Sequence, residues 1–258
     1  MLADERYRII LGLIKENGSV SASQLNKKMN VSSETIRRDL YYLESKNMLR
    51  RVHGGAVAVT KMNEFKVLEK RLDENVEEKV ECAKNALKLI KNGDVIFVDS
   101  GSTAIEFAEA LKGRFENLTV ITNSLDVYKH LGNSGYKLII IGGEYLAQEE
   151  ANCGFFAVEM INNMHADKAF VFPSAVSLKN GVMSCEMDLY SVQCAYKNNA
   201  DRVIFVADSS KFEKSGLAKI CDMDIQYEFV TDSKINHEIY QMYRENNIKI
   251  VKGGKNEK

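Results

Sequence analysis

Four arginines near the N-terminus have the most specific chemistry in the sequence, because guanidinium groups bind phosphate. Arg37 and Arg38 are adjacent, and Arg50 and Arg51 follow shortly after. The first 60 residues hold 10 Lys and Arg against 6 Asp and Glu, a balance of +4, whereas the rest of the chain holds 25 against 30, a balance of −5. The net charge of −1 therefore conceals a basic N-terminal part. Such a concentration of positive charge predicts contact with phosphates.

The elements around these arginines predict a helix-turn-helix. Apolar residues at positions 7, 10, 11 and 14 recur at helical spacing, which predicts a helix over 6–15. The S-x-x-Q sequence of Ser21 to Gln24 is a capping box that opens a second, short helix. A tight turn then leads to a third helix from about Ser33 to Lys46. Two short helices joined by such a turn form a helix-turn-helix.

Residues 48–57 predict a wing, because they form two short strand-like runs around a glycine turn. In a winged helix-turn-helix the third helix meets base edges and phosphates in the major groove. Arginines of the wing reach the backbone or the minor groove. One wing residue, His53, is equally suited to a hydrogen bond within the turn. The residues predicted to contact DNA are Ser32, Ser33, Thr35, Arg37, Arg38, Arg50, Arg51 and His53.

The rest of the chain predicts an α/β domain. After a charged connector without apolar periodicity, a helix is expected over 76–90. Seven β-branched or aromatic runs follow, at 94–99, 118–123, 137–141, 168–172, 202–208, 227–231 and 248–251. Helical or loop segments separate most of them, which favours a mostly parallel sheet covered on both faces. We therefore predict a winged helix-turn-helix domain at 1–58, a linker at 59–75 and a larger α/β domain at 76–258.

Polar and glycine-rich sequences follow the first three of these strands. The first strand ends in Asp99-Ser100-Gly101-Ser102-Thr103 and leads directly into a helix, which makes an anion cradle. The second ends in Thr122-Asn123-Ser124 and the third in Gly142-Gly143. Ligands of open parallel sheets bind beyond the carboxyl ends of the strands. These sequences therefore predict a site for a phosphorylated polyol.

Both regions resemble the DeoR family of bacterial transcriptional regulators, and the resemblance covers nearly the whole chain. In the N-terminal part it is carried by Val31-Ser32, residues 35–40 and residues 49–56. In the larger part it is carried by Arg71, Asn75, Lys79, residues 99–103 and 122–124, Gly142-Gly143, Gly154, residues 208–212 and Thr231-Asp232. The chain departs from the family at residues 172–177, where the family commonly has small residues and this chain has its only proline.

The resemblance implies a sensor domain similar in fold to ribose-5-phosphate isomerase. It also implies an effector that is a phosphorylated sugar or a related catabolic intermediate. Lys211 would give the effector a cation for its phosphate or a hydrogen bond to its sugar. The residues that the resemblance implies for effector binding are Asp99, Ser100, Gly101, Ser102, Thr103, Asn123, Ser124 and Lys211, to which the glycine-rich strand ending adds Gly142 and Gly143.

The function expected from these features is that of a repressor of a carbohydrate-catabolism operon, relieved by its effector. A homo-oligomer, dimer or tetramer, would place third helices in successive major grooves of double-stranded operator DNA. No cofactor or metal is expected, because the four histidines are widely spaced and the five cysteines form no C-x-x-C pair. Acidic residues near the N-terminus and the absence of a long apolar run predict a cytoplasmic protein without a membrane partner.

Two other classes of function remain open at this point. A sugar-phosphate isomerase needs a positioned carboxylate base. Related isomerases carry an Asp-Gly-Ala-Asp loop, and the corresponding Pro173 to Ser177 holds no carboxylate, although Asp99, Glu186 and Asp188 are conceivable bases. A winged helix can also bind protein or RNA. Single-stranded RNA needs exposed aromatic residues for stacking, and we expect at least one of Tyr41 and Tyr42 to be in the core.

Overall fold

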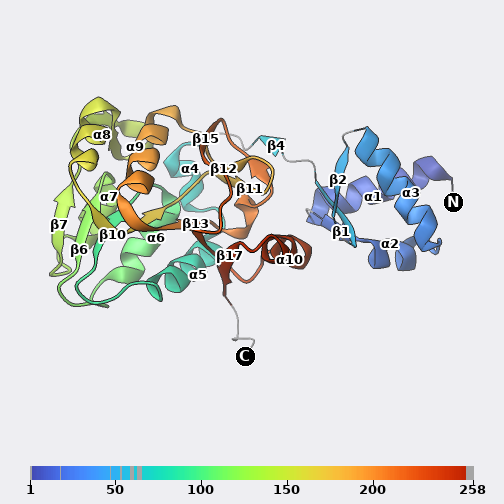
Figure 1. Ribbon diagram of the computed structural model, residues 1–258, viewed down its shortest axis with the longest axis horizontal. Coiled ribbons are helices and arrows are strands. Elements are labelled where there is room, and N and C mark those ends of the chain that lie inside the picture. The colour runs from blue at the N-terminus through green and yellow to red at the C-terminus, as the bar shows by residue number, and fades with distance from the viewer. Residues whose placement is uncertain are drawn as a thin grey trace. The chain divides into compact units, whose positions relative to one another are not determined.

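The computed structural model describes residues 2–17, 19–46, 48–52, 54–58, 61–62 and 66–253. They form two compact units, residues 1–61 with 236–246 and residues 62–235 with 247–258 (Figure 1). No helix in these ranges is both long and apolar enough to cross a membrane.

The first unit is a winged helix-turn-helix, as predicted. Its elements within residues 1–58 are α1 (Ala3–Asn17), β1 (Ser19–Ser21), α2 (Ala22–Met29), α3 (Ser33–Ser45), β2 (Leu49–Val52) and β3 (Gly55–Ala58). The strands form an antiparallel sheet in the order β1-β3-β2. Ser21 and Gln24 form the predicted capping box at the start of α2. Asn30 takes the left-handed conformation, with φ of 49°, and Ser32 caps α3, so the turn between the two helices is fixed locally.

The second unit is built on a parallel seven-stranded sheet in the order β17-β16-β13-β10-β5-β6-β7. The strands are β5 (Val95–Val98), β6 (Thr119–Thr122), β7 (Lys137–Ile140), β10 (Ala166–Val171), β13 (Ala200–Val206), β16 (Glu228–Thr231) and β17 (Lys249–Lys252). All seven predicted runs are strands of this sheet. Its fold confirms the expected mostly parallel α/β class.

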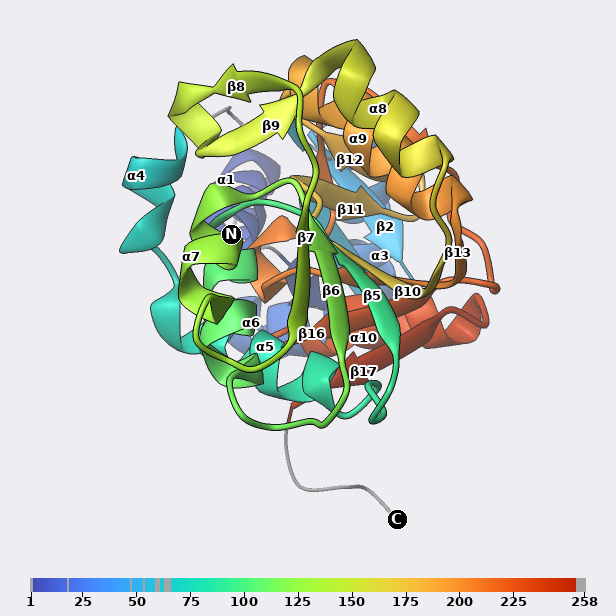
Figure 2. The same ribbon diagram turned by 90° about the vertical axis from the view of Figure 1, so that its left-hand side faces the viewer.

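Helices cover both faces of the sheet (Figure 2). Side chains of a strand alternate between the faces, and β5 shows this directly. Ile96 and Val98 join a core with α5 (Val76–Leu87), α6 (Ser102–Leu111) and α7 (Leu125–Leu131), whereas Phe97 packs on Tyr196 of α9, with ring centroids 4.9 Å apart. The remaining helices of this unit are α8 (Gly154–Asn162) and α9 (Met187–Asn198), whereas α10 (His237–Glu245) belongs to the first unit.

Short elements surround the carboxyl end of the sheet. One is the hairpin of β8 (Glu144–Leu146) and β9 (Ala151–Cys153), and another is the antiparallel sheet of β11 (Ala175–Ser177), β12 (Gly181–Ser184) and β15 (Ala218–Cys221). The strands β4 (Lys61–Met62) and β14 (Lys214–Ser215) form a two-stranded sheet. There are also 3-10 turns at Ala147–Glu149 and Ser209–Lys211. The connector also contains a helix that the sequence did not predict, α4 (Leu68–Leu72), whose Leu68 is buried.

The strand order reverses once. The chain enters the sheet at β5, moves outward through β6 and β7, and then crosses back to β10 on the other side of β5. It continues outward through β13, β16 and β17. The loops that follow β5 and β10 therefore leave the sheet in opposite directions. This is a topological switch point, where open parallel sheets form ligand sites.

Candidate functional site

The third helix of the first unit presents two arginines to solvent. The Arg37 and Arg38 side chains are 73% and 79% exposed, whereas Ile36 and Leu40 are buried on the opposite face. Each guanidinium lies near Glu34, with N–O distances of 3.4 and 3.3 Å. Exposed pairs of this kind contribute little to stability. Both arginines are therefore available for phosphate.

The predicted DNA contacts at the start of α3 also serve local structure. Ser32 Oγ accepts from Thr35 N at 3.2 Å and lies 2.9 Å from Thr35 Oγ1. Ser33 Oγ accepts from Asn26 Nδ2 at 2.6 Å. These bonds position the first turn of α3, the part of a recognition helix that meets base edges.

One charged residue within the family-like sequence is structural. Asp39 is buried, and its carboxylate accepts two hydrogen bonds from Arg6 of α1, from Nε at 2.6 Å and from Nη2 at 2.9 Å. The pKa of Arg6 is raised by the hydrogen bond to Asp39. This pair holds α3 against α1, and sequence reasoning missed it because both residues read as surface charges.

The wing is described only in part. Arg51 lies near Glu44, with 3.7 Å between Nη1 and Oε2, and its guanidinium stacks 5.7 Å from the centre of the Tyr41 ring. Arg50 belongs to β2. His53 lies outside the described residues. The expectation that Tyr41 or Tyr42 joins the core is wrong, because they are 65% and 44% exposed.

A cavity opens at the switch point of the second unit. It is lined by Ser100 to Thr103 after β5, Phe172 to Ser174 after β10, and Asp208 and Lys211 after β13. Other lining residues come from the connector (Lys66, Arg71), the turn before β9 (Glu149) and the segment from β12 into α9 (Ser184 to Glu186, Leu189 and Gln193). The structure therefore brings Ser100, Gly101, Ser102, Thr103 and Lys211 together, as predicted.

Glycine is required at the residue directly before α6, the helix that starts in this cavity. Gly101 has φ of 123°, and a Cβ there would lie 3.6 Å from Nη1 of Arg71. The α6 helix begins at the next residue, so its free N–H groups face the cavity from a positive helix end. Ser100 is 3% exposed, and its Oγ has no hydrogen-bond partner among the described residues.

Unpaired buried polar atoms concentrate around this cavity. Within the described part of the chain, six such atoms are Asp99 Oδ1, Ser100 Oγ, Gln193 Oε1, Asp208 Oδ2, Glu149 Oε1 and Arg71 Nε. Four of them accept hydrogen bonds only, because they belong to carboxylates or to an amide carbonyl. Buried polar atoms are rarely left without partners in folded proteins. Residues that line the cavity or directly adjoin it therefore have unused capacity to accept hydrogen bonds.

Asp99 directly precedes the cavity-lining residues Ser100 to Thr103 and is itself fully buried. Its Oδ2 accepts from Gln193 Nε2 at 2.9 Å and from Phe172 N at 3.2 Å. Burial raises its pKa to about 6, against the opposing effect of its hydrogen bonds, chiefly the one from Gln193. Near neutral pH the carboxylate is therefore ionised, and its burial in the charged form lowers the free energy of unfolding.

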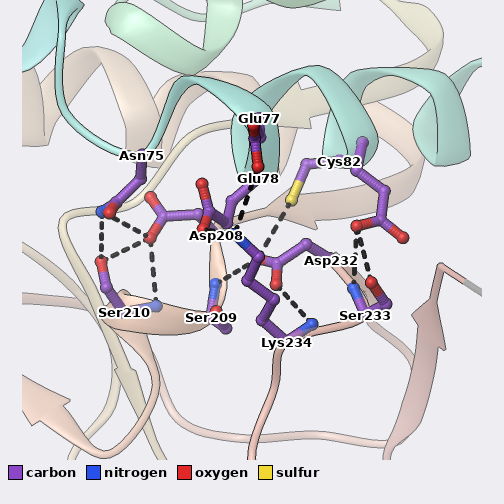
Figure 3. Close-up of polar contacts among 11 residues, drawn as sticks. Asn75, Glu77, Glu78, Cys82, Asp208, Ser209, Ser210, Asp232, Ser233 and Lys234 are labelled. Atoms are coloured by element: carbon purple, nitrogen blue, oxygen red, sulfur yellow. Dashed lines mark hydrogen bonds and ion pairs between the residues drawn. The ribbon is translucent and has the colours of Figure 1, made fainter.

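A hydrogen-bond network fixes the loop that carries Lys211 (Figure 3). Asp208 Oδ1 accepts from Ser210 N at 3.0 Å and from Asn75 Nδ2 at 3.4 Å. Asp232 Oδ2 accepts from Ser209 N at 2.6 Å. The family-like residues Asn75, Asp208 and Asp232 therefore act together as a support for the loop after β13.

Five predicted effector contacts are not among the described lining residues, namely Asp99 and, further from the cavity, Asn123, Ser124, Gly142 and Gly143. Asn123 donates to Asn152 O at 3.0 Å and accepts from Tyr196 at 3.2 Å, and Ser124 Oγ caps α7 by accepting from Val127 N. Gly143 is needed for packing, since a Cβ there would lie 2.4 Å from Cys153 O. The four residues further from the cavity follow β6 and β7, on the side of β5 away from β10 and β13.

Sequence reasoning also missed cavity residues that come from distant segments. Arg71 and Glu149 form an ion pair, and both line the cavity. Lys66 lines it too and donates to Glu74 at 2.7 Å. The family resemblance at Arg71 was the one available signal. Within the described ranges no cluster of three or more His, Cys, Asp or Glu is arranged to hold a metal ion.

Two family models match the chain. A DeoR-like helix-turn-helix domain matches residues 6–62, and a DeoR C terminal sensor domain matches residues 74–233. Among solved structures, ribose 5-phosphate isomerase A from Methanocaldococcus jannaschii is similar over 54% of this chain and 55% of its own, with 20% identity and a TM-score of 0.41.

Curated relatives match nearly end to end. The chain is 34% identical over 237 residues to the lactose phosphotransferase system repressor of Lactococcus lactis, covering 90% of this chain and 91% of that protein. It is 30% identical over 246 residues to the HTH-type transcriptional regulator GolR of Listeria innocua, covering 95% and 96%. It is 33% identical over 231 residues to the transcriptional repressor AccR of Agrobacterium fabrum, covering 89% of each.

Proposed function

The chain belongs to the DeoR family of transcriptional regulators, and on that premise we propose that it represses a carbohydrate-catabolism operon until a phosphorylated sugar or related intermediate binds in the cavity. The isomerase alternative is set aside, because the relatives are regulators. The division at 1–58, 59–75 and 76–258 is retained as part of the proposal.

One observation carries the effector assignment, namely the kinds of unpaired polar atoms in the residues that line the cavity or directly adjoin it. Four buried acceptors require donors, and the hydroxyl groups of a sugar supply them. The N-terminus of α6 and Lys211 supply the amide donors and the positive charge that a phosphate requires. Both halves of a phosphorylated sugar therefore have complementary partners in one cavity.

The first unit is proposed to bind double-stranded operator DNA through the start of α3. Arg37 and Arg38 would neutralise phosphates, while Ser33 and Thr35 lie where base edges are met. A cytoplasmic homo-oligomer, dimer or tetramer, would place several such helices on one operator. Effector binding would then change the population of subunit arrangements that bind DNA.

The test is fluorescence anisotropy of the purified protein on the DNA upstream of its own gene, at two salt concentrations, with and without a panel of sugar phosphates. We expect salt-dependent binding that exceeds binding to a scrambled duplex of equal length, and one sugar phosphate that weakens it. Unphosphorylated forms of the same sugars are the matched controls. Equal binding to both duplexes would contradict the operator assignment, and indifference to every sugar phosphate would contradict the effector assignment.

A further inference from the structure

The unexpected helix α4 is attached to the rest of the second unit in part by side chains that also line the cavity. The ion pair of Arg71 with Glu149 joins α4 to the turn before β9, and the Glu149 side chain is 2% exposed. Buried Lys79 of α5 donates to the carbonyl oxygen of Arg71 and, at 3.5 Å, to that of Leu72. These carbonyls end α4, so the helix is held at its C-terminal end by polar bonds and at its start by buried Leu68.

The guanidinium of Arg71 is only partly used by Glu149. Nη2 donates to Glu149 Oε2, whereas Nε is buried and has no partner in the described residues. Nη1 lies over Gly101, at the entrance to the N-terminus of α6. Arginine carries five N–H donors in a planar fork. The Nη1 donor of Arg71 thus lies close to the start of α6, near its free amides and the unpaired hydroxyl of Ser100.

We propose that Arg71 binds the anionic group of the effector from the connector, so that occupancy of the cavity docks α4 against the rest of the second unit. The inference rests on the proposed function, because it requires an anion at the N-terminus of α6. The anion bridges two segments that are otherwise joined through Glu149. It therefore binds the docked arrangement more tightly than the undocked one, and it shifts the population toward docking.

The consequence for regulation lies in where α4 sits in the chain. Residues 66–74 lead from the helix-turn-helix unit to the sensor unit, so a change in their docking is the first effect of the effector outside the cavity. Lys66, which lines the cavity and pairs with Glu74 at 2.7 Å, belongs to the same segment. When a connector residue itself binds the effector, no other residues are needed to transmit binding from the site to the connector.

Hydrogen–deuterium exchange of the full chain tests this, with inorganic phosphate as the probe and potassium chloride of equal ionic strength as the control. At about ten times the half-saturating phosphate concentration, exchange through local opening should slow about tenfold both in residues 100–103 and in residues 66–74. Protection of 100–103 alone would overturn the inference and leave the cavity assignment intact. Protection of neither segment would overturn both.

Three variants separate ligand contact from simple attachment of α4. Arg71→Gln should weaken phosphate binding at 100–103 by about tenfold or more and abolish the slowing in 66–74. Lys70→Gln, the same charge change at an exposed position of α4, should respond like the native chain. Glu149→Gln should raise exchange of 66–74 without phosphate, and phosphate should still slow it. Continued slowing of 66–74 in Arg71→Gln would refute the role of Arg71.

Discussion

Replacement of Asp99 by Asn should stabilise the second unit and remove part of its pH dependence. Asp99 is fully buried, and burial raises its pKa from the ordinary 3.8 to about 6. This difference corresponds to about 3 kcal/mol between the ionised and protonated forms of the folded state. Asn has the same shape without the charge, and its carbonyl can accept the two bonds that now come from Gln193 and Phe172. At pH 8 the variant should therefore be more stable by up to about 3 kcal/mol.

The sign of the pH dependence follows from proton binding. Between pH 3.8 and about 6 the folded state holds the Asp99 proton and the unfolded state does not, so stability falls as pH rises through this window. Below the window both states are protonated, and the variant and native proteins should be about equally stable.

Urea unfolding at several pH values between about 4 and 8, followed by circular dichroism, gives both stabilities. Subtracting the native curve from the variant curve isolates Asp99 from the other titrating groups. A difference that is flat with pH, or a variant less stable than the native protein at pH 8, would refute the assignment of a raised pKa to burial.

Three further substitutions test other parts of the structure. Asp39→Ala removes the buried carboxylate that accepts two hydrogen bonds from Arg6, so the first unit should lose about 3 kcal/mol and DNA binding should fall. Unchanged thermal unfolding of this unit would contradict the role of the pair. Arg38→Ala should reduce the slope of log affinity against log salt concentration for operator binding by about one, whereas Arg114→Ala, the same change in the second unit, should not. If the Arg38 variant and the native protein have equal slopes, Arg38 does not contact phosphate. Lys211→Ala should leave the DNA affinity measured by anisotropy unchanged and abolish the sugar-phosphate response. Its control is Lys219→Ala, at an exposed residue paired with Asp222 at 2.7 Å. A normal response of the Lys211 variant would show that this lysine is not an effector contact.

Local sequence signals predicted the elements because each signal acts over a few residues. The Ser21 capping box, the Ser32 cap and the β-branched runs of the sheet all depend on neighbours in the chain. The helix α4 carries no such signal. It is held by Lys79 and Glu149, which only the tertiary structure brings to it.

Only part of the site could be predicted, because local signals do not show which strands are neighbours in the sheet. Three consecutive strand endings read as one site, but the chain crosses back after β7, so the cavity takes its residues from the loops after β5, β10 and β13. Strand order depends on contacts between distant residues and leaves no local pattern. Asn123 shows the further difficulty that a polar residue at a strand end can be fully engaged in structural hydrogen bonds.

The reversal of strand order at β5 also bears on how the second unit folds. On one side, Val95 pairs with Thr119, a nearby segment, whereas on the other side Ile96 pairs with Lys168 after a long excursion of the chain. Closing a longer loop costs more conformational entropy, so we expect β5, β6 and β7 to associate before β10 joins them. The cavity lies along that late junction. An effector would then stabilise the step that completes the sheet, and newly made sensor units would become fully stable sooner in cells that already contain the effector.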